Sequence, residues 1–230
     1  MFERYRGFKL SRLNSPKFRH LKLLLFWPAF GIAFFILERI LNLKYHMVSC
    51  SLDAKIPFCE FFVIPYYFWF VFLIGMLVWS LLFDIPTFKR YMKYIIITYT
   101  ATLLIYVIYP TAQDLRPNEF ARNNIFTHIV SMLYNFDTNT NVCPSMHVIG
   151  SFAVYFSARN SKHFGTRGWR IAFLIVALLI SISTVFLKQH SVVDIFAALI
   201  LCAIVYPFVY STEKISEYTV NDEKKAEQYI

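Results

Sequence analysis

Long apolar stretches separated by shorter polar connections dominate the pattern of the chain. There are six of them: Leu23–Ile40, Phe61–Phe83, Tyr94–Tyr109, Pro144–Ala158, Trp169–Leu187 and Ser191–Tyr210. A helix needs about 20 apolar residues to cross the hydrocarbon core of a bilayer, and no strand-like alternation points to a barrel. The pattern therefore predicts an all-α, polytopic membrane protein with six transmembrane helices.

Two of these stretches are shorter than a full span. Tyr94–Tyr109 is slightly short and Pro144–Ala158 clearly so. The fourth helix could continue toward Phe164, or its outer end could lie inside the membrane beneath a loop. The sequence leaves both arrangements open.

Basic residues are concentrated on one side of the predicted spans. Of the 23 lysines and arginines, 17 lie before the first span, in the second connection, in or directly beside the fourth connection, and after the last span. Because basic residues favour the cytoplasmic side, both termini are expected inside the cell. The chain then divides into a basic cytoplasmic segment (1–22), a six-helix transmembrane domain (23–210) and a polar cytoplasmic tail (211–230).

The composition agrees with a membrane protein. Hydrophobic residues make up 57% of the chain and charged residues only 16%. The net charge of +9 is expected to bind anionic lipid headgroups. The basic residues are scattered between the spans and form no folded basic domain, so we expect no nucleic-acid partner. The four cysteines form no CxxC pair, so we expect no zinc site. Whether Cys50 and Cys59 form a disulfide in an outer loop stays open.

The segment "HSVVD" places His190 and Asp194 four residues apart at the start of the last apolar stretch. This spacing puts both side chains on one helix face. A carboxylate bound to one ring nitrogen fixes the tautomer and leaves the other nitrogen available as a nucleophile. A charge inside an apolar span is costly and usually functional. The pair is therefore a candidate catalytic unit.

The segment "CPSMH" begins the fourth apolar stretch. Pro144 is typical of a first helical turn, which would place Ser145 and His147 there as well. The unpaired N–H groups of a first turn bind anions. Ser145 could donate to a phosphate oxygen, and His147 could transfer a proton. In the preceding loop Arg116 offers the planar fork that recognises phosphate.

Together these segments resemble the type 2 phosphatidic acid phosphatase superfamily, membrane lipid phosphatases and phosphotransferases related to vanadium haloperoxidases. The family pattern is KxxxxxxRP, PSGH and SRxxxxxHxxxD, and the chain has "YPTAQDLRP", "PSMH" and "STVFLKQHSVVD" in the same order. The resemblance implies the helical core of that superfamily, a site at the extracytoplasmic face and a phosphohistidine mechanism without cofactor or metal. It assigns catalysis to His190, His147 and Asp194, and phosphate binding to Arg116 and Ser145.

The chain departs from the family pattern at three positions. Tyr109 replaces the lysine, Met146 the PSGH glycine and Thr184 the arginine of the third motif. Two of three cationic phosphate ligands are thus missing. Lys188, two residues before His190, could restore one charge. The segment "STVFLKQH" also resembles the inositol phosphorylceramide synthase branch.

The sequence therefore predicts an integral membrane lipid phosphate phosphatase, with a lipid phosphate as substrate and membrane lipids as its surroundings. The alternative is a phosphotransferase that moves a phospho-headgroup between lipids, as an inositol phosphorylceramide or sphingomyelin synthase does. A second alternative is an inactive scaffold or a transporter. The sequence does not determine the headgroup or the oligomeric state.

Overall fold

The structure, a computed structural model, describes residues 5–39 and 43–210. The predicted polar tail 211–230 and the predicted end of the first span at Ile40 lie outside the described residues. In the described ranges the α-helices are α1 (Phe26–Arg39), α2 (Val63–Phe83), α3 (Ile85–Ile108), α4 (Ile125–Phe136), α5 (Met146–Arg159), α6 (Arg167–Phe186) and α7 (Val192–Tyr210). Short 3₁₀ helices cover Leu10–Arg12, Arg19–Leu25 and Glu60–Phe62, and two-residue strands β1 (His46–Met47) and β2 (Thr111–Ala112) pair in parallel.

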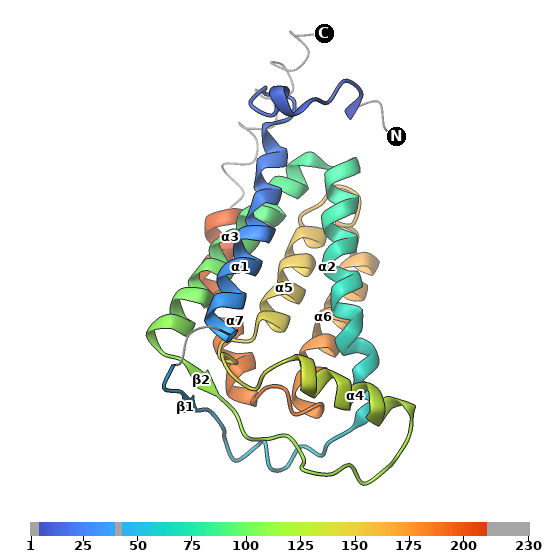
Figure 1. Cartoon of the computed structure of the whole chain (residues 1–230). Coiled ribbons are helices and arrows are strands. Elements are labelled where there is room, and N and C mark those ends of the chain that lie inside the picture. Colours follow the sequence, from blue (N-terminus) through green and yellow to red (C-terminus); the bar gives the residue numbers. More distant parts are fainter. Residues whose placement is uncertain (1–4, 40–42, 211–230) are drawn as a thin grey trace.

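Six of the helices run alternately up and down in one bundle, as predicted, while α4 lies across the end at which α5 and α7 begin (Figure 1). Among the described residues, five helical segments are long and apolar enough to cross a membrane, including Arg19–Arg39, which joins a 3₁₀ turn to α1. The sixth helix of the bundle, α5, packs against α2, α3, α6 and α7. The fold is therefore an all-α, multi-pass membrane architecture with α5 at its centre.

The structure corrects the predicted bounds of the third span. α3 begins at Ile85, not Tyr94, because Asp84 caps it by accepting a hydrogen bond from the Thr87 N–H at 3.1 Å. Pro86 in the first turn also favours a helix start. The early turns are basic, so the hydrophobic pattern does not reveal them.

Helix α4 differs from the expectation from the sequence, which places no helix in the connection 110–143. Asn124 begins α4 with a capping box in which its side chain accepts from the N–H of Thr127, whose hydroxyl accepts from the Asn124 N–H. One face of α4 packs against α2 through Val130 and Leu133, in a small core with Val63.

The structure also decides between the two arrangements of the fourth span. α5 has 14 residues and ends at Arg159, so the continuation toward Phe164 was wrong. At 1.5 Å per residue it is roughly 21 Å long, less than the hydrocarbon core of about 30 Å. Its N-terminus therefore lies within the bundle, and α4 lies across the end of the bundle that α5 does not reach (Figure 1).

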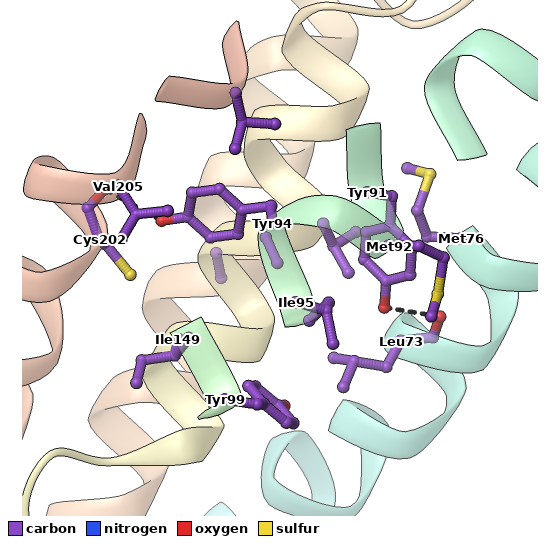
Figure 2. Packing of buried hydrophobic residues seen from close by; sticks show 14 of the residues in the cluster. Leu73, Met76, Tyr91, Met92, Tyr94, Ile95, Tyr99, Ile149, Cys202 and Val205 are labelled. Atoms are coloured by element: carbon purple, nitrogen blue, oxygen red, sulfur yellow. Dashed lines mark hydrogen bonds between the residues drawn. The ribbon is translucent and has the colours of Figure 1, made fainter. Parts of the chain in front are cut away.

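The core of the bundle carries tyrosines whose hydroxyls are all paired within the protein. Tyr91 donates to the carbonyl of Leu73 at 3.3 Å, and Tyr94 donates to the carbonyl of Cys202 at 3.0 Å. Figure 2 shows both rings pointing from α3 into the space between neighbouring helices. Because lipid offers no hydrogen bonds, these pairs link α3 to α2 and α7 at defined positions.

Gly150 allows the close approach of α5 to α2 and α3. A Cβ at this position would lie 2.7 Å from the Tyr99 hydroxyl and 2.9 Å from Trp69 Nε1. Overpacking of this kind costs about 1–3 kcal/mol, which outweighs the roughly 1 kcal/mol by which alanine favours a helix over glycine. We expect Gly150→Ala to lower the thermal unfolding temperature of the detergent-purified protein.

The matched control is Gly75→Ala in α2, because a Cβ at Gly75 meets no atom within 4 Å. That variant should unfold at or above the parent temperature. Equal stability of the two variants would show that α5 does not depend on this contact.

The alternating helices and the basic bias together predict the orientation in the membrane. A reporter fused after Gln113, in the connection between α3 and α4, should report the extracytoplasmic side. A reporter after Lys162, between α5 and α6, should report the cytoplasm. Finding both on one side would contradict the orientation and the proposed location of the site.

Candidate active site

The turn between α6 and α7 brings His190 and Asp194 together. His190 Nδ1 lies 3.1 Å from Asp194 Oδ2. The same oxygen accepts from the Ser191 N–H at 2.9 Å, so Asp194 also caps the helix that begins at Val192. Asp194 is fully buried and His190 is 8% exposed. The carboxylate therefore fixes both the His190 imidazole and the backbone of the next residue. Nε2 of His190 remains as the available ring nitrogen.

His147 faces this pair from the first turn of α5. Its ring centroid lies 5.7 Å from that of His190 in an edge-on arrangement. On its other side it contacts two aromatic rings of α2, Tyr66 at 4.4 Å and Trp69 at 4.5 Å between centroids. The site thus holds a second imidazole next to that of His190.

Ser145 stands at the N-cap position of α5, but its hydroxyl makes no capping bond. The side chain is fully buried and Oγ has no hydrogen-bond partner. Its N–H donates to the Asp194 carbonyl at 3.2 Å, which joins the starts of α5 and α7. A buried hydroxyl left unpaired beside the free N–H groups of a helix start is an arrangement that suits an anionic ligand.

Arg116 extends from the loop after α3 toward the α6–α7 turn. Its guanidinium donates to the carbonyls of Tyr134, Asp137 and Thr138 at 2.9–3.1 Å and to Gln189 Oε1 at 2.5 Å. Nε has no partner, and burial lowers the pKa of the group. Arg116 therefore binds the residue next to His190 and holds one charge at the site.

Lys188 is engaged by the loop between α1 and α2. Its Nζ donates to the carbonyls of Asp53 at 2.7 Å and Ile56 at 2.5 Å, in the loop between α1 and α2. Burial lowers the pKa of this ammonium. Two of its three N–H donors are thus used by the loop, and one remains.

Tyr109 and Thr184, which replace the family lysine and arginine, bring no positive charge to the site. The Tyr109 ring is exposed and stacks on His46, with centroids 4.2 Å apart. Thr184 is buried, its hydroxyl bonds Ser181, and its carbonyl accepts from the N–H of His190 at 3.2 Å. Thr184 thus supports the His190 turn by its backbone alone.

The structure adds polar residues that the sequence analysis missed. Asp137, at the end of α4, accepts from the Tyr66 hydroxyl at 3.2 Å, and its pKa is raised chiefly by burial. Asp53 binds the start of α7. Gln189 accepts a hydrogen bond from Arg116. Of Asp137, Asp53 and Gln189, only Gln189 had a signal in the sequence, its position directly before His190.

The cysteines contribute no disulfide and no metal site in the described part of the chain. Cys50 and Cys59 are both free, which answers the question that the sequence left open. Burial first, and the nearby Asp194 second, raise the pKa of the Cys143 thiol to about 12. Residues 5–39 and 43–210 contain no group of three metal-ligating side chains.

Comparison with known proteins assigns the family. The PAP2 superfamily matches residues 90–216, more than half of the chain, and the protein belongs to this superfamily. The match confirms the superfamily predicted from the three motifs and indicates a membrane enzyme of the phosphatase or phosphotransferase type. No curated protein and no solved structure matches the chain. The resemblance to the inositol phosphorylceramide synthase branch stays a prediction.

The His190–Asp194 pair generates a direct test. Asp194→Asn should keep the fold, because an amide oxygen can still accept from the Ser191 N–H. It should lower kcat by about two to four orders of magnitude, as loss of an orienting carboxylate does elsewhere. Turnover of a lipid phosphate measures this, with Asp114→Asn, an exposed carboxylate of the neighbouring loop, as the control. Equal turnover of both variants would make the pair structural only.

Proposed function

We propose that the protein is a lipid phosphate phosphatase that acts at the extracytoplasmic membrane face through a phosphohistidine on His190. The observation that carries the proposal is the convergence of His190, paired with Asp194, His147 at 5.7 Å between ring centroids, and the unpartnered Ser145 hydroxyl. Two imidazoles facing each other at a helix start provide a nucleophile and a proton carrier for phosphoryl transfer.

In the first step His190 Nε2 attacks phosphorus, so an N–P bond forms as the P–O bond to the lipid alcohol breaks. Protonated His147 gives its proton to the leaving oxygen. Asp194 stabilises the positive charge that develops on His190 through its bond to Nδ1. In the second step neutral His147 takes a proton from water, whose oxygen attacks phosphorus and releases inorganic phosphate and free His190.

The phosphoryl oxygens need positive charge and donors as the transition state forms. Ser145 Oγ and the first-turn N–H groups of α5 supply neutral donors. Arg116 supplies a fixed charge and has one unpartnered N–H at Nε. Lys188 is the second cation of the proposed site. Its third N–H, which the loop 53–56 does not use, would donate to a phosphoryl oxygen.

A lipid substrate agrees with the apolar surroundings of the site. A groove of ≈ 740 Å³ runs between α2 and α6 and is lined by aromatic and aliphatic side chains. It includes Phe62, which stacks on Phe186 one residue before the α6–α7 turn, at 4.3 Å between centroids. We infer that an acyl chain occupies this groove while the headgroup reaches His190.

The second candidate is a phosphotransferase, in which a lipid hydroxyl replaces water in the second step. The small number of cations favours it. A phosphodiester carries one negative charge and a monoester up to two, and this site has lost two family cations and contains the carboxyl of Asp137. The first half of the reaction is the same in both candidates.

The test separates both candidates from an inactive protein. Purified protein is incubated with phosphatidic acid, prenyl diphosphate or phosphatidylglycerophosphate, with and without a lipid alcohol. Phosphate release supports the phosphatase, and a new phospholipid formed without phosphate release supports the transferase. With ³²P-labelled substrate, an acid-labile label should appear on the protein and be absent from His190→Ala. No product and no label with any substrate would reject the proposal.

A further inference from the structure

The loop between α1 and α2 reaches the nucleophile through one buried carboxylate. Asp53 is 3% exposed and lies 137 residues before His190 in the sequence. Its Oδ2 accepts from the Ser191 hydroxyl at 2.7 Å and from the Cys50 N–H at 2.7 Å. Its Oδ1 accepts from the Val192 N–H at 2.8 Å. One side chain therefore binds both residues that follow His190.

The residue two before His190 is bound to the same loop. Lys188 donates to the carbonyls of Asp53 and Ile56. Four hydrogen bonds thus join the loop to the turn, two before and two after His190. Lys188 has φ = 53°, in the left-handed region that costs a non-glycine residue about 1–3 kcal/mol unless its surroundings hold it. The loop supplies such surroundings.

The carboxylate of Asp53 is suited to this task because it is charged. Burial by itself would raise its pKa, but the hydrogen bonds from Ser191, Val192 and Cys50 outweigh burial and lower it. Asp53 also occupies the positive end of the α7 helix dipole, together with Asp194. The N-terminus of α7 is therefore filled by the protein's own carboxylates, whereas that of α5 has the unpaired Ser145 hydroxyl.

We propose that Asp53 is a positioning residue for phosphoryl transfer, which acts through Ser191 and Val192 to hold the His190 backbone at the distance and angle that attack on phosphorus requires. The inference rests on the proposed function. Asp194 orients the imidazole, and Asp53 fixes the turn from which the imidazole extends. A displacement of 1 Å at a reacting group can lower the rate by about 10²-fold, so the turn needs a rigid support.

The test compares Asp53→Asn with Asp114→Asn in the same phosphate-release and lipid-transfer assays. Three donors point at the Asp53 carboxylate, and an amide offers them one acceptor oxygen in place of two. We expect Asp53→Asn to lower kcat by about 10–100-fold and to change KM by less than about threefold, since the substrate contacts stay intact. Asp114→Asn should match the parent.

A second variant keeps the test decisive if Asp53→Asn does not fold. Ser191→Ala removes the hydroxyl that donates to Asp53 and accepts from the Val193 N–H at 3.2 Å, and it leaves the Asp53 charge in place. It should also lower kcat, and Asp53→Asn combined with Ser191→Ala should lose less than the product of the two single effects, because both disrupt one contact. Multiplicative losses would overturn the proposal.

Amide hydrogen exchange provides a readout without substrate. In Asp53→Asn the N–H groups of residues 188–193 should exchange faster than in the parent, while those in the middle of α3 should not. Faster exchange with an unchanged kcat would make Asp53 a loop anchor only, and unchanged exchange would exclude the contact. If the parent protein acts on none of the lipid phosphates, the proposed function fails, and that outcome is distinct from an active parent whose Asp53→Asn variant is equally active.

Discussion

Asp194 places a carboxylate inside an apolar helix bundle, where a charge without partners costs several kcal/mol. The protein meets this cost with the imidazole of His190 and the N–H of Ser191, both bound to one oxygen. The carbonyl of the same residue accepts from the N–H of Ser145 and so holds the start of α5 beside the start of α7. Asp194 thus positions the imidazole of His190 through its carboxylate, and the start of α5, with His147 in its first turn, through its backbone carbonyl.

The connections at the end of the bundle where α5 and α7 begin are structural parts of the candidate site and not only links between spans. Glu38, near the end of α1, accepts hydrogen bonds from Thr138, Thr140 and Asn141 in the segment that leads to α5. Arg116 binds three carbonyls in and after α4. Because the outer end of a membrane bundle meets both lipid and water, its loops stay ordered by pairing their polar groups with one another. These bonds restrict the motion of the loops that surround the two histidines.

The charges near the histidines are sparse for chemistry on phosphate. The retained family cation Arg116 is already engaged by carbonyls and by Gln189. Lys188, which could replace a missing cation, is engaged by the loop carbonyls of residues 53 and 56. Neutral donors at the start of α5 therefore carry more of the phosphate binding in the proposed mechanism. Catalysis at such a site would depend more on the exact position of His190 than on the total positive charge. The many hydrogen bonds that hold the His190 turn agree with this.

The sequence by itself determined the membrane class, the six-helix bundle, the superfamily and the pairing of His190 with Asp194, because hydrophobic length and short-range spacing are local properties. It did not reveal α4, whose twelve residues are too few to span a membrane, or the early start of α3 in a basic stretch. Only the tertiary structure brought Asp53, Asp137 and Tyr66 to the site, since each is separated from its partner by 70 residues or more. The tertiary structure also tied Lys188 to the loop of Asp53, because the direction of a flexible side chain depends on which carbonyls the folded chain places within its reach.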